Sequence, residues 1–195
     1  MKKIRMFRES ITKEEITDLP LKWFPGEIVL VDSLEKVKYA AEILARNSVI
    51  GFDTETRPSF KKGVVNQVAL LQLSTKYQAF LFRLHKVGLP AEIKKILSNP
   101  KIKKPGVAIR DDIKALQGIQ NFKPGGFIEL QDFAKELGIQ NFSLKKLTAI
   151  VLGFRISKTQ QLSNWEAETL TQAQQIYAAT DAWTALQIFE NFSKN

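Results

Sequence analysis

The chain has 195 residues, which favours one domain with a full hydrophobic core and leaves room for a short appendage. Apolar residues make up 44% of the chain, which excludes an intrinsically disordered protein. Cysteine is absent, which excludes disulfides, thiolate zinc sites and cysteine nucleophiles, and the single histidine, His85, excludes mechanisms that need two.

The protein is basic, with a formal charge of +9. Basic proteins of this size often bind polyanions, because phosphate contacts through Lys and Arg release counterions; a solvated, lysine-rich surface is an equally good explanation. The sequence shows neither a basic-then-apolar leader nor an apolar run long enough to span a bilayer, so we expect a soluble, cytoplasmic protein.

The first half of the chain alternates predicted strands and helices. Residues 1–25 are expected to form an N-terminal extension, because "DLPLKWFPGE" contains two prolines and a glycine, and residues 26–195 are expected to form the main domain. Helices are predicted over 34–47, over 90–98 and from 110 onward, and from about residue 127 the pattern is mostly helical. The predicted strands cover residues 27–33, 48–53, 67–75, 77–84 and 102–109. This order predicts an α/β domain with one mixed sheet of about five strands, flanked by helices.

Two acids follow the second predicted strand, in "GFDTET". Residues two apart on a strand share a face, so Asp53 and Glu55 can point toward one ion. The alternative is that the strand ends at Asp53 and leaves Glu55 solvated in a loop. This pair alone favours that alternative.

Two more acidic positions lie near ends of predicted elements. Asp112 stands beside Asp111 at the start of a helix, where the helix dipole favours acids whatever their function. Asp181 lies one helical turn after Tyr177 in the apolar stretch "YAATDA". A helix this apolar is expected to be buried, and a buried, unpaired aspartate is unfavourable. Asp181 is therefore interpreted either as a metal ligand or as hydrogen-bonded to a backbone group.

These carboxylates and Tyr177 would form a site with oxygen ligands alone, if the fold brings them to one edge of the sheet. Oxygen ligands without histidine or cysteine select Mg²⁺ or Mn²⁺. Two such ions are the usual apparatus for in-line displacement at a phosphodiester. Together with the basic charge, the pattern favours nuclease chemistry.

The motifs "GFDTET", "GVAIRDD" and "YAATDA", in this order and spacing, resemble the three exonuclease motifs of the DEDD superfamily. The match is to the DEDDy branch, the 3′–5′ exonucleases similar to ribonuclease D and the Werner-syndrome exonuclease, and it covers roughly residues 27–193. The sister branch has a histidine five residues before its last aspartate, where this chain has Ile176. The resemblance implies a ribonuclease H-like fold, a mixed five-stranded sheet with helices on both sides.

The resemblance also implies roles for single residues. The four metal-binding acids of the family fall on Asp53, Glu55, Asp112 and Asp181, and the family's tyrosine falls on Tyr177. The glycine-to-aspartate spacing of the second motif selects Asp112 over its neighbour. Two divalent cations, Mg²⁺ or Mn²⁺, are implied as cofactors, and nucleic acid with a 3′ end is implied as the substrate and partner.

Further substrate contacts are less firmly indicated. Lys158 is a candidate phosphate contact by resemblance, with a solvated lysine as the alternative. Trp165 is a candidate for base stacking, although tryptophans are usually buried, so core packing is favoured. Lys61 and Lys62, in the loop after the first motif, are candidates for lining the path of the nucleic acid.

Two other functions compete with the exonuclease. One is a nucleic-acid-binding module without catalysis, in which the basic surface matters and the acids are relics; the intact set of acids argues against it. The other is a phosphodiesterase that acts on short oligonucleotides. The choice between DNA and RNA depends on contacts to the 2′-hydroxyl, which no motif in the sequence identifies.

Overall fold

The computed structural model describes residues 7–58 and 66–194, and Lys61 and Lys62 therefore lie outside the described residues. A four-stranded sheet forms its centre, in the order β1 (Glu27–Val31), β4 (Gln78–Arg83), β3 (Val68–Ser74), β2 (Gly51–Thr56). β1 runs parallel to β4, and the other two pairs are antiparallel. The predicted mixed sheet and the β3–β4 hairpin are thus confirmed.

A separate two-stranded ladder lies next to this sheet. β5 (Lys104–Gly106) pairs in parallel with β6 (Phe127–Glu129), and a single bridge between Val49 and Lys103 joins the ladder to the segment before β2. The sequence predicts five strands, whereas the described residues form four strands in the main sheet and two in the separate ladder. β6 is only three residues long and leads directly into a helix, so it leaves no alternating pattern to recognise.

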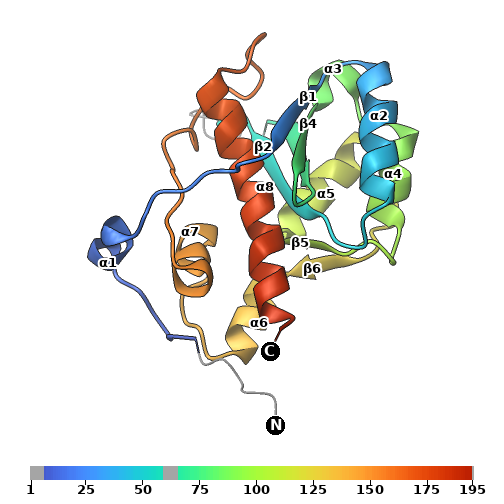
Figure 1. Ribbon diagram of the computed structural model, residues 1–195. Coiled ribbons are helices and arrows are strands. Elements are labelled where there is room, and N and C mark those ends of the chain that lie inside the picture. Colours follow the sequence, from blue (N-terminus) through green and yellow to red (C-terminus); the bar gives the residue numbers. More distant parts are fainter. Residues whose placement is uncertain (1–6, 59–65, 195) are drawn as a thin grey trace.

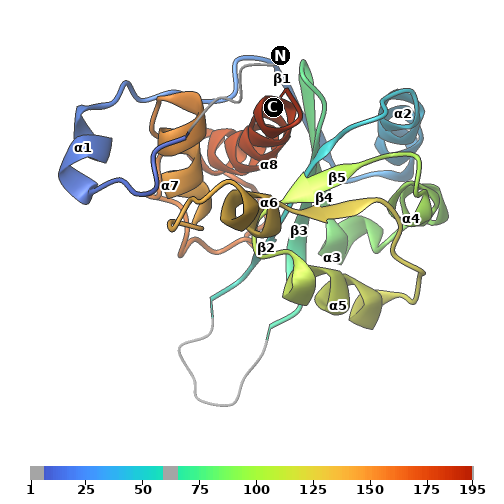
Figure 2. The same ribbon diagram turned by 90° about the horizontal axis from the view of Figure 1, so that it is seen from below.

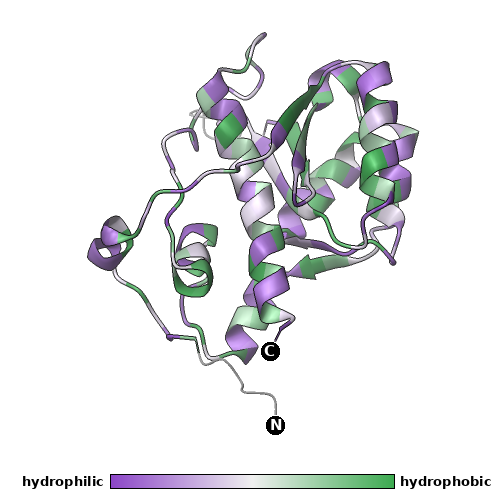
Figure 3. Cartoon of the chain, viewed as in Figure 1, coloured by the Kyte–Doolittle hydropathy of each residue, from purple (hydrophilic) through white to green (hydrophobic). Residues whose placement is uncertain are grey.

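Helices cover both faces of the sheet (Figure 1). α2 (Leu34–Ala45), α4 (Ala91–Ser98) and α5 (Arg110–Ile119) pack on one face, and the long α8 (Gln172–Phe192) packs on the other. α3 (Leu84–Val87) follows β4. Figure 3 shows hydrophobic and hydrophilic residues alternating along α2 and α4, as expected for helices with one buried side. The predicted flanking helices are confirmed.

Smaller helices surround the side of α8 that faces away from the sheet (Figure 2). α6 (Leu130–Glu136), α7 (Leu144–Leu147) and a π-helical turn, η1 (Thr148–Leu152), form a third apolar cluster with the C-terminal half of α8. α1 (Lys13–Asp18), from the predicted extension, packs against η1 through Ile16 and Ala149. No helix in residues 7–58 and 66–194 is long and apolar enough to cross a membrane.

One glycine sets how closely α8 approaches the sheet. A Cβ atom on Gly51 would lie 1.8 Å from the carbonyl oxygen of Ala182, so any larger residue would push α8 away from β2. This contact lies next to Asp181 on α8 and two residues before Asp53 on β2. The close packing therefore fixes the distance between the two elements that carry the predicted acids.

Candidate metal centre and active site

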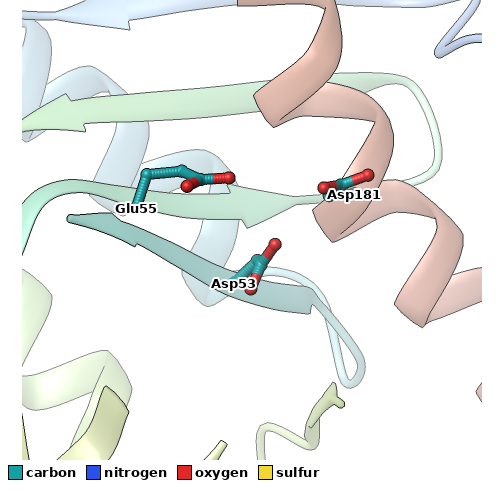
Figure 4. Close-up of side chains that lie close together, drawn as sticks. All are labelled: Asp53, Glu55 and Asp181. Carbon is teal, nitrogen blue, oxygen red and sulfur yellow. The ribbon is translucent and has the colours of Figure 1, made fainter. Parts of the chain in front are cut away.

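Three of the predicted acids lie together between β2 and α8. Asp53 and Glu55 extend from β2 and Asp181 from α8, with their carboxylates directed toward a common space (Figure 4). One oxygen from each carboxylate lies within 4.8 Å of the others. β2 continues to Thr56, so Glu55 belongs to the strand and the alternative of a frayed strand end does not hold.

The surroundings of these acids disfavour negative charge. Asp181 is buried at 7% exposure among the alanines of α8, while Asp53 and Glu55 are half-buried. Burial first, and then the charges of the neighbouring acids, raises the pKa of Asp53 well above its ordinary value and the pKa of Glu55 to about 10. Burial also raises the pKa of Asp181 to about 7, against the opposing effects of Tyr177 and the charge of Lys158.

The fourth acid, Asp112, lies beside this cluster. It accepts a hydrogen bond of 2.5 Å from the hydroxyl of Thr54, which points to the opposite face of β2 from Asp53. Burial raises the pKa of Asp112, and its charge contributes to the raised pKa of Asp53. Asp111 differs clearly, because its side chain is 94% exposed and pairs only with Lys114 among the described ion pairs. The geometry thus separates the two adjacent aspartates, with Asp112 near the cluster and Asp111 exposed, while the role of Asp112 as a metal ligand stays a prediction.

Tyr177 lies at the cluster, one helical turn before Asp181. It is buried at 9% exposure, and burial followed by the charge of Asp181 raises the pKa of its hydroxyl above the usual range. Trp165 packs beside it, with ring centroids 5.9 Å apart. Trp165 is fully buried at 0% exposure, which leaves no ring face open to a base and agrees with the core-packing alternative. Its ring supports the position of Tyr177.

The acids open into a cleft of about 450 Å³. Lys158 lines this cleft and is exposed, and its contact with phosphate stays a prediction. Lys145, which no motif in the sequence identifies, also lines the cleft from α7. In the sequence, Lys145 is one of several lysines in a segment with a helical pattern, and nothing there distinguishes it from a solvated residue. Two lysines and three carboxylates therefore line the same cleft.

A second residue missed in the sequence is Glu129, at the end of β6. Its carboxylate accepts hydrogen bonds of 2.9 Å from the backbone N–H groups of both Ala108 and Ile109. These groups precede α5, so a distant acid caps the helix that carries Asp112. Ala108 has φ of 60°, a left-handed conformation that ends the predicted 102–109 strand early. No sequence signal identifies Glu129, because its partners are backbone atoms.

The donor set fits a hard divalent cation. Three carboxylates share one small space, all donors are oxygens, and burial raises the pKa of each of these acids, which is the setting in which a proton or a cation offsets negative charge. Asp53, Glu55 and Asp181 are therefore the residues suited to hold a metal ion, with Asp112 adjacent.

This chain is similar in sequence to known proteins over most of its length. A family model described as 3′–5′ exonuclease matches residues 28–195. The Mus musculus bifunctional 3′–5′ exonuclease/ATP-dependent helicase WRN is 34% identical over 183 residues, 89% of this chain and 13% of that protein. The Homo sapiens exonuclease mut-7 homolog is 28% identical over 220 residues, 93% of this chain and 25% of that protein. The chain thus spans about a quarter or less of these relatives.

Solved structures show the same architecture. The Aedes aegypti Nibbler EXO domain superposes with a TM-score of 0.80 at 25% identity, covering 89% of this chain and 91% of that one. Escherichia coli RNase D superposes with a TM-score of 0.78 at 22% identity, covering 86% of this chain and 44% of that one. The second likeness concerns the fold alone, and both are α/β exonuclease domains of the architecture described above.

Proposed function

Because the chain belongs to the 3′–5′ exonuclease family, we propose that it removes 5′-mononucleotides stepwise from the 3′ end of a nucleic acid, with two divalent cations, Mg²⁺ or Mn²⁺. The observation that carries this proposal is the group of three carboxylates from β2 and α8, which lines a cleft together with Lys145 and Lys158. The exonuclease domain would cover residues 26–195, with residues 1–25 as an extension, in a protein that acts in the cytoplasm.

The acids divide between the two ions in this proposal. Asp53, Glu55 and Asp181 would hold the first ion, and Asp53 and Asp112 would hold the second. When bound, the ions would supply Lewis-acid stabilisation of the charge on the attacking and leaving oxygens. Asp53 is shared between the ions, so its loss should be the most damaging.

The remaining residues position the reactants. The raised pKa of Tyr177 keeps its hydroxyl protonated at neutral pH, so it would donate a hydrogen bond that orients the attacking water and would not act as a base. Lys158, whose charge already acts on Asp181, would donate to a non-bridging oxygen of the scissile phosphate. Lys145, which also lines the cleft, would contact a second phosphate.

The test uses 5′-labelled DNA and RNA oligonucleotides, single-stranded or as 3′-recessed duplexes, with Mn²⁺, Mg²⁺ or EDTA. We expect metal-dependent shortening in one-nucleotide steps. Asp53→Ala should abolish it, and Tyr177→Phe should slow it about 10²-fold, the usual effect of losing one positioned hydrogen bond. Asp112→Asn should be strongly impaired, whereas the matched control Asp111→Asn, at an exposed position, should retain activity within about twofold.

Two outcomes would favour the competing functions. Tight binding of the oligonucleotides without any metal-dependent shortening would indicate a binding module without catalysis. Faster turnover of dinucleotides than of 20-mers would indicate a phosphodiesterase of short oligonucleotides. Near-normal activity in purified Asp53→Ala and Tyr177→Phe would refute the assignment of the site.

A further inference from the structure

An exposed tryptophan stands beside the candidate site, on the segment between α1 and β1. Trp23 is 58% exposed, which is unusual for the residue with the largest apolar surface. The segment that carries it crosses α8 before entering the sheet (Figure 1). None of the roles assigned above involves this segment.

The backbone around Trp23 is firmly held. The N–H of Lys22 donates to the carbonyl of Arg155, and the N–H of Arg155 donates to the carbonyl of Pro20, each at 3.0 Å. One residue after Trp23, the N–H of Phe24 donates to the hydroxyl of Thr180 on α8, also at 3.0 Å. Phe24 itself is buried at 3% exposure. Trp23 is therefore exposed on an ordered segment anchored from both sides, and its exposure does not come from a frayed terminus.

Trp23 lines a second hollow, of about 330 Å³, which adjoins the acid cleft. Its walls come from the segment with Trp23, the N-terminal half of α8 and the loop after Phe154. Three residues line both this hollow and the acid cleft: Ser157, Tyr177 and Asp181. The two spaces thus share a wall that includes the residues proposed to bind the metal and orient the water.

We propose that Trp23 stacks on a nucleobase of one of the two nucleotides that flank the scissile phosphate, so that the N-terminal extension forms part of the substrate-binding site. This inference rests on the proposed exonuclease function. The hollow combines an aromatic ring and the apolar side chains of Leu21 and Ile176 with the hydroxyl-bearing residues Ser157 and Thr159. Such walls match a base, which has apolar faces and polar edges.

Position and charge both favour a nucleotide as the occupant. A base in the hollow would place its phosphate toward Asp181 and Tyr177, where hydrolysis is proposed. Lys22, an exposed residue on the wall, and Lys158, in the neighbouring cleft, provide positive charge on both sides. Stacking on a side chain is tolerant of sequence, because every base has a π-face, and it suits an enzyme that must accept each new 3′ end.

The first experiment compares Trp23→Ala and Trp23→Phe with the wild-type protein. Stacking is worth roughly 1–3 kcal/mol per base, so Trp23→Ala should weaken binding of a labelled single strand in EDTA by about 5- to 150-fold and raise KM similarly. Trp23→Phe should recover much of this loss. Tyr77→Ala is the matched control, since Tyr77 is 70% exposed on the β3–β4 turn and lines none of the described hollows near the acids. Unchanged thermal unfolding of the variants checks the fold.

The second experiment locates the base. Oligonucleotides with one abasic site, moved stepwise from the 3′ end, should bind the wild-type protein less tightly when the gap is at one of the last two positions. Trp23→Ala should lose this sensitivity and treat all abasic substrates alike. Equal affinities of wild type and Trp23→Ala, or an unchanged abasic profile, would overturn the inference. If the wild-type protein binds oligonucleotides but never shortens them, the proposed exonuclease activity is refuted. The binding measurements would still decide the role of Trp23.

Discussion

Replacing Asp53 with asparagine should make the metal-free protein more stable. Three carboxylates lie within 4.8 Å of one another in a space that disfavours charge. At that distance, two unit charges repel by about 3 kcal/mol at an effective dielectric constant of 20. Proton uptake by the cluster relieves part of this repulsion, which leaves about 1–3 kcal/mol for removal of one charge. Asparagine keeps the shape of the side chain, so packing is retained.

The assay is thermal unfolding in EDTA and across a titration with MnCl₂. For a chain of this size, 1 kcal/mol corresponds to roughly 2–4 °C in Tm, so Asp53→Asn should melt about 2–12 °C above the wild type in EDTA. Wild-type protein should then gain about 2.7 kcal/mol at a metal concentration a hundredfold above Kd. Asp53→Asn should gain much less. The order of the two Tm values should therefore reverse as metal is added.

Asp111→Asn provides the matched control for this experiment. It changes the net charge equally, but its side chain is 94% exposed and paired with Lys114 outside the cluster. It should behave like the wild type in EDTA and in MnCl₂. Equal Tm values for wild type and Asp53→Asn in EDTA, together with equal responses to MnCl₂, would refute a cation centre at these acids.

Three further predictions concern the frame of the site. Lys104 is fully buried, burial lowers its pKa to about 8, and its ammonium donates to three backbone carbonyls. Lys104→Met should lower the free energy of unfolding in urea by about 3 kcal/mol or more, and an unchanged urea midpoint would contradict this role. Glu129→Gln weakens the charged cap of α5, so it should lower the free energy of unfolding by about 1–2 kcal/mol and also lower kcat. An unaltered kcat would show that this cap does not influence the position of Asp112. Gly51→Ala should displace α8, and it should therefore lower the free energy of unfolding by about 1–3 kcal/mol and reduce activity. The control is Gly118→Ala in α5, where a Cβ atom meets open space, and it should leave stability unchanged or raise it.

Residues whose positions follow from periodicity could be placed from the sequence. Asp53 and Glu55 share a face because strands repeat every two residues, and Tyr177 and Asp181 share a face because helices repeat every 3.6. The order of elements likewise predicts helices on both faces of a mixed sheet. These inferences need only local geometry and a buried side to each element.

Residues whose roles depend on contacts between distant segments could not be placed. Glu129 caps α5 from the end of another strand, and its partners are backbone atoms that have no sequence identity. Trp23 and Trp165 differ only in what packs over them: one is 58% exposed and the other 0%. Composition predicts that tryptophans are mostly buried, and it cannot show which of them is the exception.

α8 carries Asp181 and also residues of two apolar clusters, so the packing of the core holds the site in shape. Repulsion among the carboxylates tends to separate β2 from α8, but Gly51 allows the two to pack in backbone contact, and the apolar clusters on either side of α8 hold the helix in place. A site that is unfavourable by itself persists only where the surrounding structure overrides it. The same packing then leaves the carboxylates few ways to move apart, so the folded protein can lower their energy by taking up protons or by binding a cation.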